Sequence, residues 1–256
     1  MLFATHVHSN YSPDAIGTLN EVFEEALRIG LSYIAMTDHL ELDNPKYHLL
    51  DVESYFADLM KFKDVYMSKG LYIATGIEVG WQPHTQKKAK QILDQFDFEY
   101  VVNSVHSFDG SASDTKNSYF KKYIKAVGDS VDACFDFDAV GHFGYLSRYN
   151  RFDENSMTAA EFGDEINQTI KKIVQRDTIL EINSNSNLEL SDTVPSLEIL
   201  KIFKQLGGKL VTYAPDSHKI ENLQRNLEKT ILCAKNAGFS TWTIKKGKKR
   251  ESVDIE

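Results

Sequence analysis

The sequence has few of the features that mark secreted or membrane proteins. It contains only two cysteines, Cys134 and Cys233, which are too few and too far apart for a disulfide framework and are expected to be buried thiols. No segment approaches the roughly 20 apolar residues of a membrane helix. Residues 1–8 lack the basic segment and the apolar run of a signal peptide. We therefore expect a protein of the reducing cytoplasm, without membrane contact.

An excess of positive charge is also missing. The chain has 29 Lys and Arg residues against 37 Asp and Glu, which gives a net charge of −8 at pH 7. Affinity for a nucleic-acid backbone comes mainly from neutralising phosphates with Lys and Arg, so we expect a small substrate and no broad nucleic-acid face. A basic run at residues 245–250 departs from this balance. Such runs are usually solvated, and we expect residues 245–256 to form a basic C-terminal tail.

What the chain does have is length and a repeated pattern. With 256 residues, of which 42% are hydrophobic, it can bury a sizeable core, and we expect one domain over residues 1–256. Short apolar, β-branched runs alternate about seven times with amphipathic stretches, which predicts parallel β/α units. The predicted strands are residues 2–6, 32–37, 71–77, 100–105, 139–142, 178–182 and 209–214.

The stretches between these strands carry helix signals. Thr18 with Glu21 forms a capping box before an apolar stripe, and Gly30 supplies a left-handed stop after it. Thr158 with Glu161 repeats the capping signature before a later helix. Helices therefore connect the predicted strands, as a parallel sheet requires.

Histidines concentrate where the predicted strands end. Six of the eight histidines lie at or just beyond a strand's carboxyl end: His6, His8, His39, His106, His142 and His218. An open sheet would gather ligands at one switch point, whereas a barrel lets every strand end face a common mouth. Because nearly every strand end carries such a residue, we expect a closed α/β barrel.

The histidines are accompanied by three carboxylates, Asp14, Glu78 and Asp216. A lone histidine at a strand end is usually structural or exposed, but nine such groups clustered without metal would place mutually repelling charges together. We therefore expect bound metal. Imidazole and carboxylate ligands suit Zn, Mn or Fe, and nine ligands exceed what one tetrahedral ion uses, so two or three divalent ions are predicted. Two ions roughly 3.5 to 4 Å apart can share an activated hydroxide and clamp a phosphoryl group, which predicts phosphoester hydrolysis.

Taken together, these motifs resemble the polymerase and histidinol phosphatase (PHP) superfamily. The resemblance rests, in chain order, on His6-Val7-His8, Asp14, Thr37-Asp38-His39, Glu78, His106, His142 and Asp216-Ser217-His218. Residues 11–14 and 104–107 are similar to the histidinol-phosphatase branch. The resemblance implies a distorted (β/α)7 TIM-like barrel, the PHP fold, with a site for three metal ions.

The resemblance also implies roles for individual residues. The ligands of the first metal would be His6, His8, Glu78 and Asp216; of the second, Glu78 as a bridge, His106 and His142; of the third, Asp14, His39 and His218. A hydroxide bridging the first two metals would attack phosphorus. Glu78, Asp38 and His218 are the candidate catalytic residues, with Asp38 as a possible proton donor to the leaving group. Asp38 has an alternative structural reading, in which it orients a ligand imidazole.

A phosphate monoester also needs cationic donors. Arg148 and Arg151 follow His142 and are the candidate substrate-binding residues, because a guanidinium matches phosphate oxygens. The alternative is an exposed charged loop. Residues 181–187 are similar to the family's Glu-Ile-Asn-Thr-Ser-Gly stretch, but Leu188, Glu189 and Leu190 follow where that branch commonly has an arginine. This departure bears on the substrate more than on the hydrolytic chemistry.

The predicted function is a metal-dependent phosphomonoesterase acting on a small phosphorylated metabolite. The best single substrate is L-histidinol phosphate, cleaved to L-histidinol and phosphate in histidine biosynthesis. One alternative is a PHP-type nuclease or nucleotide phosphatase, for which the basic run at residues 245–250 is the available feature. A non-enzymatic alternative is a metal-binding regulatory protein.

Overall fold

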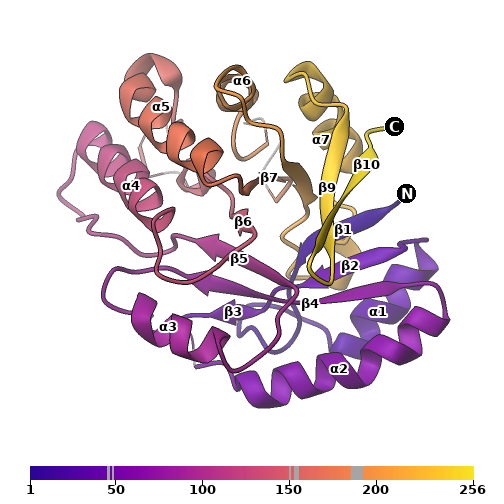
Figure 1. Cartoon of the computed structure of the whole chain (residues 1–256). Helices are drawn as coiled ribbons and strands as arrows, with labels where there is room; N and C mark the ends of the chain where they lie inside the picture. The colour runs from indigo at the N-terminus through magenta and orange to yellow at the C-terminus, as the bar shows by residue number, and fades with distance from the viewer. Residues whose placement is uncertain (45–46, 48, 150, 153–155, 186–192) are drawn as a thin grey trace.

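The chain folds into a parallel sheet that curls into a barrel with its helices on the outside, as the computed structural model shows (Figure 1). It describes residues 1–44, 47, 49–149, 151–152, 156–185 and 193–256. The strands pair in the order β1-β2-β4-β5-β6-β7-β8, with β3 also paired to β4, and all of these pairs are parallel. Their bounds are β1 (Phe3–Val7), β2 (Tyr33–Met36), β3 (His39–Leu40), β4 (Tyr72–Gly80), β5 (Tyr100–Ser104), β6 (Ala139–Val140), β7 (Ile179–Asn183) and β8 (Val211–Ala214).

Helices follow most of the strands and cover the outer face of the barrel (Figure 1). They are α1 (Leu19–Arg28), α2 (Val52–Ser68), α3 (Gln86–Leu93), α4 (Lys116–Ser130), α5 (Ala159–Gln175), α6 (Leu197–Gln205) and α7 (Leu227–Asn236), with short 3-10 turns η1 (Tyr145–Arg148) and η2 (Ile220–Asn222). The predicted capping box is confirmed, because the Thr18 side chain accepts from the Glu21 backbone and the Glu21 carboxylate accepts from Thr18 N at 2.8 Å. Gly30 ends α1 with a φ of 81°.

All seven predicted strands form, and the predicted α/β barrel is confirmed. In β1, β2, β5, β7 and β8 every residue is buried, as expected of strands covered by helices on one face and by the barrel interior on the other. The barrel closes between β8 and β1 at a narrow junction. There Ser217 N donates to His6 O at 3.3 Å, and His8 N donates to Ser217 O at 2.9 Å.

The expected basic tail is wrong. Residues 241–254 form an antiparallel hairpin of β9 (Thr241–Lys246) and β10 (Lys249–Asp254). The apolar residues of β9 alternate along the strand, so Trp242 and Ile244 are buried against the barrel, and this burial outweighs the preference of the neighbouring charges for solvent. Gly247 lies in the turn with a φ of 57°, a left-handed conformation that glycine adopts without steric cost.

The hairpin lies across the amino-terminal ends of the barrel strands. Tyr33, at the start of β2, donates to Lys245 O at 2.8 Å, and Gly247 N donates to the Tyr72 hydroxyl at the start of β4 at 3.0 Å. The Lys245 ammonium lies 2.5 Å from a carboxylate oxygen of Asp138, just before β6. The hairpin therefore covers the end of the barrel opposite to the mouth where the strands finish.

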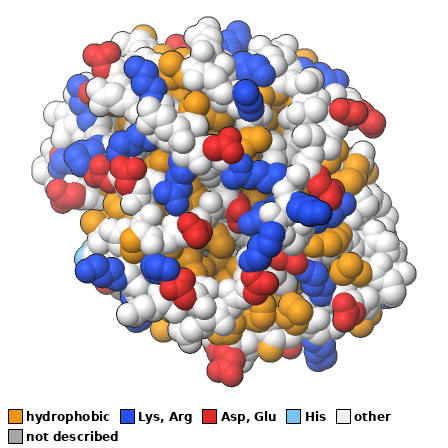
Figure 2. All heavy atoms as spheres, viewed as in Figure 1, with side chains coloured by type: hydrophobic (Ala, Val, Ile, Leu, Met, Phe, Trp, Pro, Cys, Tyr) orange, Lys and Arg blue, Asp and Glu red, His pale blue; other side chains and the backbone are white. Residues whose placement is uncertain are grey.

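The surface view drawn from the same side shows Lys and Arg interspersed with Asp and Glu, so that neither sign of charge dominates this face (Figure 2). Hydrophobic side chains are visible between the charged ones. Within the described residues, no helix is both long and apolar enough to span a bilayer.

Candidate metal centre

The carboxyl ends of the strands bring all nine predicted ligand residues together. Each of the nine lies within 4 Å of another member of the set, measured between ring nitrogens and carboxylate oxygens. We refer to them as the histidine–carboxylate cluster: His6, His8, Asp14, His39, Glu78, His106, His142, Asp216 and His218. Residues from the start, middle and end of the chain thus meet at one mouth, as barrel closure predicts.

Glu78, near the end of the long strand β4, lies at the centre of the cluster. Its Oε2 atom is 3.3 Å from His6 Nε2 and 2.7 Å from His39 Nδ1. Its Oε1 atom is 2.9 Å from His142 Nε2 and 3.2 Å from His106 Nε2. The two oxygens therefore face different histidines, which is the arrangement that a carboxylate bridging two ions requires.

Asp216 faces the cluster from the turn after β8. Its Oδ1 atom is 3.4 Å from His8 Nε2, 3.8 Å from His6 Nε2 and 3.5 Å from His218 Nδ1. The Asp216 backbone has a φ of 47°, and His142 has a φ of 22°. Positive φ is uncommon for residues with a Cβ atom and is often found at functional sites, where the surrounding structure maintains it.

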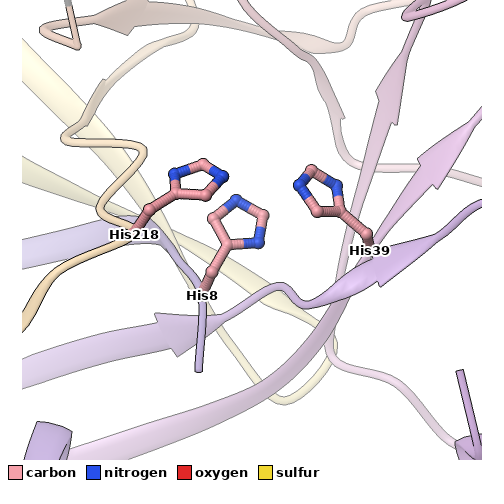
Figure 3. Close-up of side chains that lie close together, drawn as sticks. All are labelled: His8, His39 and His218. Carbon is pink, nitrogen blue, oxygen red and sulfur yellow. The ribbon is translucent and has the colours of Figure 1, made fainter. Parts of the chain in front are cut away.

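A third group of histidines meets beside Asp216. The rings of His8, His39 and His218 point toward one another from the residue after β1, from β3 and from the loop after β8 (Figure 3). The His8 ring centroid is 4.2 Å from that of His39 and 4.2 Å from that of His218. Asp14 lies on the outer side, with one oxygen 3.6 Å from His39 Nε2 and the other 3.5 Å from His218 Nε2. The Tyr47 hydroxyl donates to Asp14 at 2.8 Å.

The donor atoms of the cluster fit divalent ions. Among the described residues, the buried atoms that no neighbour meets in hydrogen-bonding geometry include His6 Nε2, His8 Nε2, both ring nitrogens of His39, and Glu78 Oε2, although Glu78 Oε2 and His39 Nδ1 are only 2.7 Å apart. Leaving such a group unpaired costs about 1–3 kcal/mol, so several in one place indicate a missing partner. Imidazole nitrogens with carboxylate oxygens are a donor set for Zn, Mn or Fe. We conclude that the residues present fit several divalent ions.

Charge interactions keep the central carboxylates ionised. Burial by itself would lower the pKa of His6, but Glu181, Glu78 and Asp216 together raise it well above its usual value. Burial would raise the pKa of Glu78, yet the surrounding histidines, chiefly His6 and His106, hold it well below the usual range. Without ions, the cluster therefore depends on protonated imidazoles to balance its carboxylates.

Two neighbouring histidines differ in the direction of their pKa shifts. Burial, with the adjacent imidazoles of His218 and His39, lowers the pKa of His8 well below its usual value. Burial would also lower the pKa of His218, but Asp14 and Asp216 outweigh it and raise the pKa to about 9. His8 is thus held neutral, the form that binds metal, whereas His218 has to lose a proton first.

Two buried carboxylates next to the cluster, Glu41 and Glu181, could not be assigned a role from the sequence. Glu181, in β7, has an oxygen 2.9 Å from His6 Nδ1, and Glu41 has an oxygen 2.5 Å from His106 Nδ1. Glu41 follows His39 by two residues, so the alternation of an extended chain puts both side chains on one side. That spacing was the available signal, but a two-residue strand is too short to be recognised from periodicity.

The contacts of Asp38 favour the structural alternative over a role as proton donor. Its carboxylate accepts hydrogen bonds from Ser9 N at 2.8 Å, from Ser9 Oγ at 2.8 Å and from Ser12 Oγ at 2.7 Å. Ser12 Oγ in turn lies 3.3 Å from His8 Nδ1. Burial raises the pKa of Asp38 despite these hydrogen bonds. Both oxygens are occupied within the loop, which favours orientation of His8 over donation of a proton to substrate.

The two candidate arginines lie in different places. Arg148, in η1, is largely buried beside the cluster, with Nη1 3.1 Å from Asp216 Oδ2 and a hydrogen bond to the Asn183 side chain. Arg151 is exposed, and its guanidinium stacks over Tyr119 at 3.9 Å from the ring centroid. Arg148 is therefore placed to meet a ligand of the cluster, whereas the described contacts of Arg151 are elsewhere.

Some of the sequence expectations cannot be placed. Leu188, Glu189 and Leu190, where the arginine of the branch was missing, lie outside the described residues. His84 is exposed and lies apart from the cluster, with its Nε2 atom 2.6 Å from a carboxylate oxygen of Asp43.

The fold and the cluster together define a class of protein, an α/β barrel whose strand ends present a histidine and carboxylate site for several divalent ions. The chain belongs to the PHP domain family. The model of that family, described as PHP domain, matches residues 4–185. The family resemblance inferred from the residues is confirmed.

The most similar relatives include histidinol phosphatases. A probable histidinol-phosphatase of Clostridium acetobutylicum is 26% identical over 249 residues, covering 93% of this chain and 95% of that one. The histidinol-phosphatase of Lactococcus lactis is 26% identical over 244 residues, covering 91% of this chain and 90% of that one. A crystal structure of the Lactococcus lactis histidinol phosphate phosphatase, complexed with zinc, L-histidinol and phosphate, has a TM-score of 0.85 at 24% identity. The match covers 97% of this chain and 98% of that one. This likeness in structure confirms the PHP-type barrel.

Proposed function

We propose that the protein is a metal-dependent phosphomonoesterase that hydrolyses L-histidinol phosphate to L-histidinol and phosphate. The observation that carries the proposal is the central position of Glu78 between two sets of buried histidines, with Arg148 beside them. The relatives named as histidinol phosphatases, each similar over more than nine-tenths of this chain, support the substrate.

The proposed ligand sets follow the geometry of the cluster. One ion would bind His6, His8, Glu78 and Asp216, a second Glu78, His106 and His142, and a third Asp14, His39 and His218. Among the described residues, ligand atoms lie within 4.8 Å of one another in His6, His8 and Asp216, which supports the first set, and in His6, Glu78 and His142, which supports Glu78 as a bridge. Two further groups cross the proposed sets: His8, His39 and His218, and His39, Glu41 and His106. Bound divalent ions supply Lewis acidity, lower the pKa of a coordinated water and neutralise charge on the phosphate.

The chain's own residues bind and orient the substrate around these ions. Arg148 is held by Asp216 and Asn183, so its planar guanidinium is fixed before substrate arrives. Its Nε atom is buried and, among the described residues, has no hydrogen-bond partner. A guanidinium in such a position donates charge-assisted hydrogen bonds to phosphate oxygens. Asp38 acts through Ser12 to hold the His8 ring in place.

The test is a screen of metabolite phosphates, including histidinol phosphate, with purified protein loaded with Zn²⁺ or Mn²⁺ and analysed for metal content. We expect phosphate release from histidinol phosphate at a rate well above that from the other esters. If the protein hydrolysed only other esters, the proposed substrate would be wrong, but the assignment as a phosphomonoesterase would stand. Bound metal without hydrolysis of any ester would support the non-enzymatic alternative.

The position of the basic run argues against the nuclease alternative. The basic run at residues 245–250 lies in the β9–β10 hairpin, at the end of the barrel opposite to the cluster. Three of its cations, Lys245, Lys248 and Arg250, form ion pairs with acidic side chains that precede the barrel strands. These cations therefore have acidic partners and lie away from the metal centre.

A further inference from the structure

We propose that Glu41 is a positioning residue of the metal centre that orients the His106 ring. The two ring nitrogens of His106 face opposite ways. Nε2 lies 3.2 Å from Glu78 Oε1 and 3.2 Å from His142 Nε2, within the cluster. Nδ1 lies 2.5 Å from Glu41 Oε1, on the outer side. The inference rests on the proposed function, because it takes Nε2 as the atom that binds the ion.

The burial of Glu41 distinguishes this contact from a surface ion pair. The Glu41 side chain is 1% exposed, and among the described residues its second oxygen, Oε2, has no hydrogen-bond partner. Burying a carboxylate is costly unless it is paired and hydrogen-bonded. A side chain kept there for stability alone would be better replaced by an apolar one. Its contact with His106 therefore has a function beyond folding.

The backbone of β4 makes room for Glu41. Strand β3 pairs with β4 so that Leu40 lies opposite Val79, which brings the next residue, Glu41, beside Gly80. A Cβ atom at Gly80 would lie 2.1 Å from Glu41 Oε1, closer than any two such atoms can come. Any residue larger than glycine at position 80 would push the carboxylate away from His106.

The same arrangement occurs on the other side of Glu78. His6 presents Nε2 to Glu78 at 3.3 Å, while its Nδ1 lies 2.9 Å from the buried Glu181. Carboxylate partners of this kind fix the tautomer and the orientation of a ligand imidazole and raise its basicity. Glu41 and Glu181 therefore support one imidazole each on the two sides of the central carboxylate.

The experiment measures zinc content per chain and zinc affinity by competition with a chromophoric chelator. We expect Glu41→Ala to lower the affinity for one zinc ion roughly 10- to 100-fold, the usual effect of removing such a partner of a ligand histidine. Glu41→Gln keeps an oxygen that accepts from His106 Nδ1–H and should recover most of that affinity. Asp43→Ala removes an exposed carboxylate two residues further on, paired with exposed His84, and should leave affinity unchanged.

Gly80→Ala tests the same contact without removing the charge of Glu41. The carboxylate is the end of a flexible side chain, so the protein can fold with Glu41 displaced. We expect Gly80→Ala to lower the zinc affinity about as much as Glu41→Ala does. The double variant should bind zinc no more weakly than Glu41→Ala alone. Such non-additivity is expected when two changes break one interaction.

Three results would overturn the role of Glu41: wild-type zinc affinity in Glu41→Ala, no recovery in Glu41→Gln, or additive losses in the double variant. Circular dichroism of each variant checks folding, and the isosteric Glu41→Gln remains informative where Ala destabilises the chain. Failure of the proposed function is seen separately, in wild-type protein that binds no zinc or hydrolyses no phosphoester. Wild-type protein that does both, alongside an unaffected Glu41→Ala, overturns only the present inference.

Discussion

Glu78 contacts histidines of the first two proposed metal positions, so its replacement should affect both of them. Glu78→Gln keeps the shape of the side chain but removes the charge that balances His6 and His106. Removing even an outer partner of a ligand costs about 10- to 100-fold, so we expect at least about a 100-fold loss of phosphate release. Phosphate assays combined with zinc analysis measure this. A variant with full zinc content and wild-type turnover would contradict the bridging role.

The raised pKa of His218 predicts how the stability of the metal-free protein depends on pH. Because Asp14 and Asp216 outweigh burial and raise its pKa from the usual 6.5 to about 9, its contribution to stability is complete below pH 6.5. That contribution is lost as the pH rises through about 9. In urea titrations of chelator-treated protein, we expect the free energy of unfolding to fall over this range. His218→Ala should make the fall shallower, and an unchanged slope in that variant would refute the assignment.

At the residue scale, sequence could predict which side chains approach the mouth but not how each is used. Arg148 and Arg151 both follow His142 and could not be distinguished, because only the η1 turn directs Arg148 inward. Asp38 was expected beside the cluster, but its hydrogen bonds to the Ser9 and Ser12 loop depend on a loop conformation that no periodicity encodes.

Among the elements, α1 offers a test away from the metal centre. The exposed Thr18 side chain accepts from the Glu21 backbone at 3.3 Å and closes the capping box. Losing an N-cap hydroxyl costs about 1 kcal/mol. We expect Thr18→Ala to lower the free energy of unfolding in urea by about that amount with wild-type phosphatase activity. Thr18→Ser retains the hydroxyl and should be close to wild type; equal losses in both variants would show that the cap is not the cause.

Strands were predictable because parallel strands buried on both faces are apolar throughout and so stand out from amphipathic helices. Three strands, β3 and the two of the last hairpin, were not predictable in this way. The two residues of β3 are too few for any pattern, and without β3 the position of Glu41 could not be inferred. In the last hairpin, the charges of residues 245–250 outweighed the alternation of Trp242 and Ile244, although the burial of those two side chains decides the structure.

At the scale of the whole molecule, the β9–β10 hairpin is expected to contribute to the free energy of unfolding but not to kcat. Trp242 is 3% exposed and packs edge-on against Phe3, with 6.3 Å between ring centroids. Truncating a buried tryptophan costs about 3–5 kcal/mol. We expect Trp242→Ala to lower the unfolding free energy by that amount while kcat at 25 °C stays unchanged, because the hairpin is at the far end of the barrel.

The exposed Ser252 in β10 provides the matched control for this prediction. Ser252→Ala should change neither the free energy of unfolding nor kcat. A Trp242→Ala protein that remains folded but loses kcat would contradict the separation of the two ends of the barrel.

The narrow junction between β8 and β1 determines when during synthesis the metal centre can form. Across it, Thr5 Oγ1 donates to Tyr213 O at 2.8 Å, a contact between residues 208 positions apart. Contacts so distant in sequence form late in folding, because the intervening chain must first be ordered. His6 and His8 are synthesised long before Asp216, so the proposed first site has its full set of ligands only once the last barrel strand has been made. Metal uptake would then mark the completion of the barrel.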